Sequence, residues 1–319
     1  MQLKSVRASS LEELNQRAGV FVAACGFEHR SISISKLATG PRERVAICFE
    51  EWPSDIARPK NEKEFNRLGF RLLSAAGSDS RGVQRIVEEA MNAAESSRSI
   101  AFDISSMTRA WHGAIIRQLR TAEAAGEMET FFTYVPAEFK PPSLHVPPNE
   151  IVAPVDGFSS LATPNLPIAA VIGLGYERER ALGLQQFLDP ELTLLMVPNS
   201  GGADPYYAEL SRNNRGLLDR TDPKWIFEYD LAEPSAAFST LASVVAGLRE
   251  SYRVVLTSLG PKIFGILCFL LATKFEDVSV WRVSAGAHGK PKDAYADLSR
   301  IVVASTIWEP STLLDLDLK

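Results

Sequence analysis

Cysteine and histidine are scarce in this chain of 319 residues. The three cysteines, Cys25, Cys48 and Cys268, are an odd number without the spacing of a metal motif, and the four histidines include no His-x-x-x-His pair. Small disulfide-built folds use many more cysteines, and zinc sites need clustered thiols or imidazoles. We therefore expect buried thiols in a reducing compartment, no metal centre and no disulfide framework.

Long apolar runs are also missing. The most apolar stretch, residues 263–273, is too short to cross a bilayer, which takes about 20 residues. The first residues, Met-Gln-Leu-Lys-Ser-Val-Arg, lack the apolar core of a signal peptide. The sequence thus predicts a cytoplasmic protein with no membrane association.

Basic residues do not dominate the sequence. There are 34 lysines and arginines against 39 acidic residues, and the net charge is −5. No extended nucleic-acid surface is expected, because such binding depends on neutralising phosphates. Several enzyme signatures are absent as well: the Gly-x-Ser-x-Gly elbow, the Walker A loop, and the third glycine and acidic ribose ligand of the dinucleotide fingerprint. We expect no NAD site and no resident cofactor.

The sequence does contain an internal repeat. Residues 19–28 are an apolar run followed by glycine, phenylalanine and glutamate, and residues 168–177 repeat this run with glycine, tyrosine and glutamate. The two glycines lie 149 positions apart. A second pair of similar segments, 99–109 and 253–262, lies at nearly the same offset. A repeat of this length indicates two structural units of one kind.

Short apolar runs alternate with helix-like segments in both halves. Strands are predicted at 19–25, 44–49, 99–104, 131–135, 168–173, 192–197, 225–229, 253–257, 278–283 and 299–305, with helices within 1–18 and at 61–75. Such alternation is typical of parallel sheets with helical crossovers. We predict an α/β fold of two tandem Rossmann-like parallel-sheet units related by the repeat: residues 1–140, a proline-rich linker at 141–167, and residues 168–319.

Each glycine–aromatic–glutamate elbow places charged residues directly after a strand. Glu28 and Arg30 follow the first elbow, and Glu177 and Arg178 follow the second. Open α/β sheets bind ligands at the carboxyl ends of their strands, so these four are candidate ligand-binding residues. The alternative is structural: the glycines make turns, and the glutamates occupy first-turn helix positions that the helix dipole favours.

The turn after the third predicted strand concentrates polar residues: Asp103, Ser105, Ser106, Thr108 and Arg109. Small hydroxyls can donate to a phosphate, and an arginine can bind it through two nitrogens. Helix capping by Ser106 or Thr108, with Asp103 bonding turn amides, is the competing interpretation.

The second half has a similar turn with Thr257, Ser258, Gly260 and Lys262. If the two turns face each other across a pseudo-twofold axis, each supplies one cation to a shared pocket. The loop 198–207 adds Asn199 and Tyr206 as candidate ligand-binding residues, because a tyrosine in a glycine-rich loop can stack on a base. Its alternative is a loop whose tyrosines cover the core.

The turns at 103–109 and 257–262 resemble those of the CARF family of nucleotide-sensing Rossmann-like domains. The resemblance rests on Asp103, Ser105, Ser106, Thr108 and Arg109 in one half and on Thr257, Ser258, Gly260 and Lys262 in the other. It implies that two copies face each other and bind a cyclic oligonucleotide. The chain departs from that pattern in carrying both halves itself, without a recognisable effector nuclease domain, and in pairing an arginine with a lysine.

These observations favour a sensor or regulatory protein that binds a nucleotide or another phosphorylated small molecule. The resemblance implies a place in prokaryotic antiviral defence, with a protein partner in a defence complex. An enzyme stays open: a hydrolase or transferase acting on a nucleotide or phosphosugar, with Asp103 or Glu28 as acid/base and Arg109 as anion clamp. A protein–protein module of a larger complex is the third hypothesis. The ligand, the oligomeric state and the downstream partner are not identified by the sequence.

Overall fold

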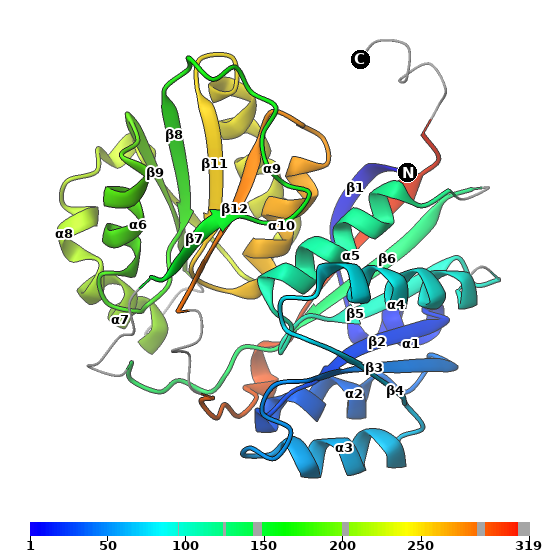
Figure 1. Ribbon diagram of the computed structural model, residues 1–319. Helices are drawn as coiled ribbons and strands as arrows, with labels where there is room; N and C mark the ends of the chain where they lie inside the picture. The colour runs from blue at the N-terminus through cyan, green and yellow to red at the C-terminus, as the bar shows by residue number, and fades with distance from the viewer. Residues whose placement is uncertain (95, 124–125, 143–148, 200–203, 286–290, 312–319) are drawn as a thin grey trace. The chain divides into compact units, whose positions relative to one another are not determined.

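A computed structural model describes residues 1–94, 96–123, 126–142, 149–199, 204–285 and 291–311 (Figure 1). The chain divides into two compact units, and each is described by itself. The first unit contains Met1–Pro136 together with Asp293–Lys319, and the second contains Ala137–Lys292. The first unit is therefore built from both ends of the chain.

The first unit is a doubly wound α/β fold around a seven-stranded sheet. Its strands are β1 (Gln2–Ser9), β2 (Val20–Cys25), β3 (Glu43–Phe49), β4 (Arg71–Ala75), β5 (Ser99–Asp103), β6 (Met128–Tyr134) and β13 (Val302–Glu309). Its α-helices are α1 (Leu11–Arg17), α2 (Ser33–Leu37), α3 (Arg58–Arg67), α4 (Ser80–Ala93) and α5 (Arg109–Thr121). Apolar residues of α1, α2 and α3 pack against β2 on one face, whereas α4 and α5 pack against each other on the opposite face (Figure 1).

Five parallel strands form the centre of this sheet, in the order β4-β3-β2-β5-β6. The chain moves outward from β2 to β4 and then returns to the other side of β2 for β5, so the strand order reverses between β2 and β5. Every residue of β2 and of β5 is buried, which accounts for their unbroken apolar runs. β13 continues the sheet antiparallel to β6, and β1 pairs antiparallel with β13.

The second unit has a six-stranded sheet. Its strands are β7 (Ile151–Pro154), β8 (Ile168–Gly173), β9 (Leu192–Pro198), β10 (Ile226–Tyr229), β11 (Arg253–Ser258) and β12 (Ser279–Ser284). Its α-helices are α6 (Arg180–Leu188), α7 (Pro205–Asn213), α8 (Arg215–Leu218), α9 (Pro234–Leu248) and α10 (Lys262–Ala272). The core on one face joins α6, α7 and α8 to β8 and β9, while α10 packs against α9 and β11.

The two sheets have the same strand order. The parallel strands of the second unit run β10-β9-β8-β11-β12, and the antiparallel β7 follows β12 as β13 follows β6. Position by position, β8 corresponds to β2 and β11 to β5, which are the strands that carry the repeated sequence segments. The predicted fold of two Rossmann-like α/β units related by an internal repeat is confirmed.

Three sequence-based boundaries differ from the structure. The strand expected at 299–305 is β13, and it joins the first sheet, so the tail does not continue the second half. The segment 141–167 is more than a linker, because β7 lies within it and pairs with β12. The helix expected at 61–75 ends at Arg67 and is followed by β4. β4 and β7 are short and half-exposed edge strands, so they lack the apolar run that marks a central strand.

The apolar stretch at 263–273 forms a core helix. All ten residues of α10 after Lys262 are buried, which requires an apolar surface on every side. Among the described residues, no helix combines the length and the hydrophobicity that a membrane span needs.

Candidate functional site

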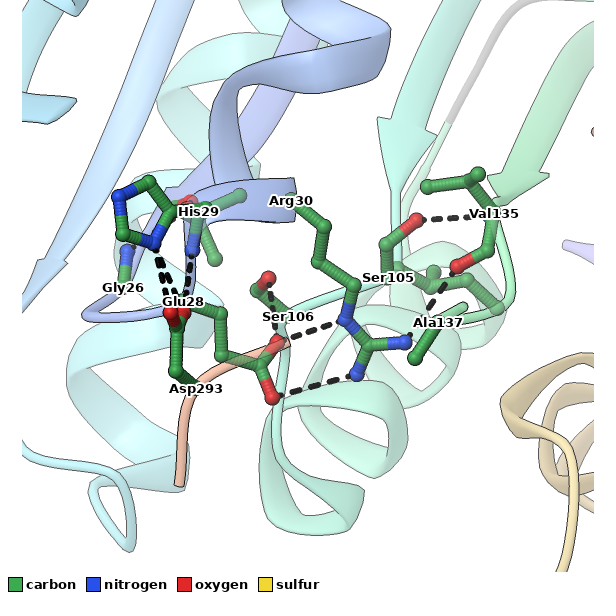
Figure 2. Close-up of polar contacts among 12 residues, drawn as sticks. Gly26, Glu28, His29, Arg30, Ser105, Ser106, Val135, Ala137 and Asp293 are labelled. Carbon is green, nitrogen blue, oxygen red and sulfur yellow. Dashed lines mark hydrogen bonds and ion pairs between the residues drawn. The ribbon is translucent and has the colours of Figure 1, made fainter. Parts of the chain in front are cut away.

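The two polar turns predicted in the first half meet where the strand order reverses. The elbow at Gly26 follows β2, and the turn at 104–108 connects β5 to α5. In open α/β sheets, a crevice forms at such a switch point because the loops of the two central strands leave toward opposite faces. Figure 2 shows the side chains gathered there.

An ion pair and a hydroxyl join the elbow to the turn. Arg30 Nε donates to Glu28 Oε2 at 2.7 Å, its Nη1 donates to the Val135 carbonyl at 3.4 Å, and Ser106 Oγ donates to Glu28 Oε2 at 3.2 Å (Figure 2). Arg30 is 8 % exposed. Burial alone would lower the pKa of Arg30, but the Glu28 carboxylate raises it above its ordinary value, so the guanidinium stays charged.

Asp103 and Ser105 are used inside the turn. The Asp103 carboxylate accepts hydrogen bonds from the amide and the hydroxyl of Ser105, and Ser105 Oγ accepts one from the Val135 amide at 2.9 Å. Both residues are buried. Their hydrogen bonds fix the backbone between β5 and α5, so their side chains are not exposed to a ligand. The Ser106 side chain is partly exposed.

Thr108 caps α5, as one of the sequence interpretations proposed. Its Oγ1 accepts a hydrogen bond from the Trp111 amide at 3.1 Å and donates to the Gly77 carbonyl at 2.8 Å. Arg109 is consequently the first residue of α5 and is partly exposed. A cation at this position adds its charge to the partial positive charge of the helix N-terminus.

Side-chain amides hold the elbow of each unit in the same way. In the first unit, Asn61 Nδ2 donates to the carbonyls of Gly26 and Glu28, at 2.9 and 2.8 Å. In the second unit, Asn214 Nδ2 donates to the Gly175 carbonyl at 2.9 Å, and Asn213 Nδ2 donates to the Tyr176 carbonyl at 2.7 Å. Sequence reasoning did not assign this role to Asn61; the repeat offered a signal for it, because both units place asparagine after the second parallel strand.

His29 and Asp293 form a second polar pair beside the elbow. His29 Nδ1 lies 2.8 Å from Asp293 Oδ2 (Figure 2). The His29 ring stacks on Tyr295 with centroids 4.6 Å apart. Burial alone would raise the pKa of Asp293, but hydrogen bonds from the His29 ring and amide hold it below its ordinary value. Sequence reasoning missed this pair because its members are 264 positions apart.

A pair of thiols and a buried arginine lie under the elbow. Cys25 and Cys48 are register partners on β2 and β3, and Arg58 Nε donates to the Cys25 carbonyl at 3.1 Å. Arg58 is 5 % exposed, and its Nη1 has no hydrogen-bond partner among the described residues. The Cys25 thiol and the charge of Arg58 lower the pKa of Cys48 to about 7 despite its burial, whereas the pKa of Cys25 is raised.

The thiol pair predicts how stability changes with pH. A thiol whose folded pKa is lowered stabilises the fold above its unfolded pKa of about 8.5, and this stabilisation is lost as the pH falls through 7. We expect the unfolding free energy of the first unit to rise by about 1 kcal/mol from pH 7 to 8.5 in the unmodified protein, because the gain from Cys48 exceeds the loss from Cys25, and not to rise in Cys48→Ser. Urea unfolding at intervals of half a pH unit measures this change in unfolding free energy.

Cys268 provides the control for that experiment. It is buried in α10 of the second unit, whereas Cys25, Cys48 and Arg58 belong to the first unit. Cys268→Ser should leave the pH slope of the first unit unchanged. An unchanged slope in Cys48→Ser would show instead that Cys48 does not ionise in this range.

Glycines occupy the switch point of the second unit. A Cβ on Gly175 would lie 2.2 Å from the Leu259 carbonyl oxygen, and a Cβ on Gly260 would lie 2.1 Å from the Leu174 carbonyl oxygen. The two turns therefore touch through their backbones. Three of the predicted residues lie in or beside this turn. Thr257 is buried, and its hydroxyl has no hydrogen-bond partner among the described residues. Ser258 Oγ donates to the Pro261 carbonyl at 3.3 Å, and Lys262 is the first residue of α10.

The charged residues after the second elbow lie on the surface. Glu177 pairs with Arg180 at 2.8 Å, and Arg178 pairs with Glu179 at 3.3 Å with 63 % of its side chain exposed. Unlike Glu28 and Arg30, these two residues do not pair with each other. The structure thus gathers the candidate charges of the first elbow and disperses those of the second.

Asn199 and Tyr206 take part in structural contacts of the second unit. Asn199 Nδ2 donates to Glu228 at 2.8 Å, and the Tyr206 hydroxyl donates to the Ala137 carbonyl at 2.7 Å. The Tyr206 ring lies edge-on to those of Phe139 and Tyr176. This aromatic cluster matches the alternative interpretation of the loop, although its residues 200–203 lie outside the described residues.

Comparison with known proteins adds little to this geometry. No family model matches the chain, and no curated protein matches it. Two solved structures of AtPrR2 show a remote likeness: the complex with NADP+ and (+)pinoresinol has 13 % identity and a TM-score of 0.26, covering 70 % of this chain and 82 % of that one. The apo form has 14 % identity and a TM-score of 0.24, covering 74 % and 87 %. Likeness at this level carries no argument about function.

Proposed function

We propose that the switch point of the first unit binds a phosphorylated small molecule of the nucleotide class, and that the protein is a sensor or regulatory component. One observation carries this proposal: the elbow after β2 and the turn after β5 are tied together by Ser106, Glu28 and Arg30 at the point where the strand order reverses. Ligands of open α/β sheets bind at this position.

The charges at this position suit an anion with neighbouring hydroxyls. Arg109 is the first residue of the 13-residue helix α5, where backbone amides and the helix dipole favour a phosphate. Glu28 is 19 % exposed at its side chain and is held in place by Arg30, so its oxygens can accept hydrogen bonds from sugar hydroxyls. The site therefore offers a cation for the phosphate and an acceptor for the sugar.

The sensor role and its biological setting rest on the resemblance to CARF domains. That resemblance supports a cyclic oligonucleotide as ligand, a place in prokaryotic antiviral defence and a protein partner in a defence complex. A sensor holds its ligand without changing it, so the nature of the recovered ligand separates a sensor from an enzyme.

Arg109→Ala tests the proposal. Losing one charged hydrogen-bond donor should weaken binding by about 1.5–3 kcal/mol, which is roughly a 10- to 150-fold rise in Kd. Thermal shift against mononucleotides, cyclic oligonucleotides and phosphosugars finds the ligand, and calorimetry gives Kd. Arg117→Ala, which removes the same charge eight positions further along α5, is the matched control and should bind as the unmodified protein does.

An enzyme is the second candidate, and the His29–Asp293 pair favours it. A carboxylate on Nδ1 orients the ring of a histidine and supports its use as a general acid or base through Nε2. His29 is one-third exposed, and no hydrogen bond to its Nε2 occurs in the part of the chain that the structure describes. Mass analysis of the bound ligand decides: a ligand returned altered by the unmodified protein and intact by His29→Gln identifies an enzyme.

A further inference from the structure

The loop between β3 and α3, residues 50–57, exposes two large apolar side chains. Trp52 is 42 % exposed and Ile56 is 45 % exposed. The loop follows the carboxyl end of β3, the strand that pairs with β2 in the first sheet. It therefore lies at the same edge of the sheet as the elbow and the turn of the proposed site.

Both side chains stand on strained backbone. Trp52 has a φ of 58° and Ile56 a φ of 47°, in the left-handed region that favours glycine. For a bulky or β-branched residue this conformation is unfavourable. Burial does not compensate for the cost, because both side chains are exposed. Strain of this kind concentrates where a surface has to present a side chain to a ligand.

Hydrogen bonds hold the loop in this shape and connect it to the proposed site. The Ala57 amide donates to the Phe27 carbonyl of the elbow at 3.0 Å. The Glu51 carboxylate accepts from the Gly77 amide at 3.0 Å, and the Gly77 carbonyl accepts from Thr108, the cap of α5. The strained loop is thus bonded both to the elbow and, through Gly77, to the helix that begins with Arg109.

Spacing along the sheet edge fits one nucleotide. β5 and β3 are separated by two strand spacings, about 10 Å, with β2 between them. A mononucleotide whose phosphate lies at the N-terminus of α5 crosses the elbow with its sugar and reaches the loop after β3 with its base. The base is the part of such a ligand that needs a flat apolar surface.

We propose that Trp52 is the stacking platform for the base of a purine nucleotide, and that Ile56 adds a second exposed apolar side chain to the same loop. The inference rests on the proposed phosphate site and specifies its ligand class. Indole rings stack on bases of any sequence, and the larger purine ring covers more of the indole than a pyrimidine does. Trp52 thereby takes the role that the sequence suggested for Tyr206, whose ring packs within an aromatic cluster of the second unit.

The test compares ligands with and without a base. Calorimetric titrations of the full chain with AMP, GMP, UMP and ribose 5-phosphate give Kd for the unmodified protein, Trp52→Ala and Trp52→Phe. We expect the purine nucleotides to bind about 5- to 150-fold more tightly than ribose 5-phosphate, the range for one stacked base. Trp52→Ala should abolish that advantage while leaving ribose 5-phosphate binding unchanged, and Trp52→Phe should retain most of it.

Two further variants separate stacking from folding. Trp52→Gly relieves the left-handed strain, so it should raise the melting temperature of the free protein while losing the preference for purines. Trp225→Ala removes a partly exposed tryptophan of the second unit and should change neither the melting temperature nor the preference for purines. A lower melting temperature in Trp52→Gly would show that Trp52 supports the fold, and this result would overturn the proposal.

The remaining outcomes distinguish this inference from the proposed function. Equal binding of AMP and ribose 5-phosphate, unaffected by Trp52→Ala, would overturn the stacking platform and leave the phosphate site standing. Equal loss of both ligands in Trp52→Ala would also overturn it, because the loop would then shape the whole site. If none of the four probes binds, this inference fails, and the proposed function fails only if the cyclic oligonucleotides of the thermal-shift screen do not bind either.

Discussion

Arg30→Ala is expected to lower the unfolding free energy of the first unit by about 3–5 kcal/mol, the usual cost of removing one partner of a buried ion pair. Arg30 is 8 % exposed and bonds both Glu28 and the Val135 carbonyl. Its loss leaves a largely buried carboxylate without a cation and frees the elbow from the end of β6. Urea unfolding of the first unit measures the change.

Two controls identify the cause of that loss. Arg30→Met keeps much of the side-chain volume without the charge, so a similar loss in this variant assigns the effect to the ion pair. Arg178→Ala changes the corresponding elbow of the second unit, where the ion pair is exposed and contributes little. If Arg30→Ala unfolds at the same urea concentration as Arg178→Ala, the ion pair does not hold the elbow.

The central strands could be predicted because their signals are local. β2, β5, β8 and β11 are short apolar runs ended by polar or glycine-rich turns, and burial on both faces makes such runs continuous. Helix caps are equally local: Ser10 and Thr108 both accept hydrogen bonds from amides three positions later.

Pairings between distant segments could not be predicted in this way. β13 lies beside β6, and Asp293 beside His29, only because the chain returns to the first unit after completing the second. β1 alternates polar and apolar residues without an apolar run, since it is an edge strand with one neighbour. A single sequence contains no signal for which segments become such neighbours.

The sequence predicted where the polar turns lie better than which contacts their side chains make. The repeat located both switch points, and Glu28, Arg30 and Ser106 do come together in the first. The same reasoning gave Glu177 and Arg178 equal weight, although they lie on the surface. The repeated segments fix the backbone path, whereas the bonding of each side chain depends on neighbours that differ between the units.

The two units thus connect the same pair of turns by different means. In the first unit, side chains bridge the elbow and the turn, and the nearest heavy atom to a Cβ on Gly26 would be 3.6 Å away. In the second unit, the backbones of the two turns are in contact at Gly175 and Gly260. A switch point closed by backbone has less room for a ligand, so the first unit is the better candidate for binding.

This difference predicts unequal responses of the two units to adding one methyl group. Gly260→Ala should cost the second unit about 3 kcal/mol, because the new Cβ would lie 2.1 Å from the carbonyl oxygen of Leu174 and backbone atoms cannot move aside as a flexible side chain can. Gly26→Ala should leave the first unit nearly unchanged. Gly247→Ala in α9, where an added Cβ would meet no atom within 4 Å beyond its chain neighbours and the helix's own backbone, should stabilise the second unit by about 1 kcal/mol. Urea unfolding of the three variants measures all three effects, and a tolerated Gly260→Ala would mean that the two turns of the second unit are not in backbone contact.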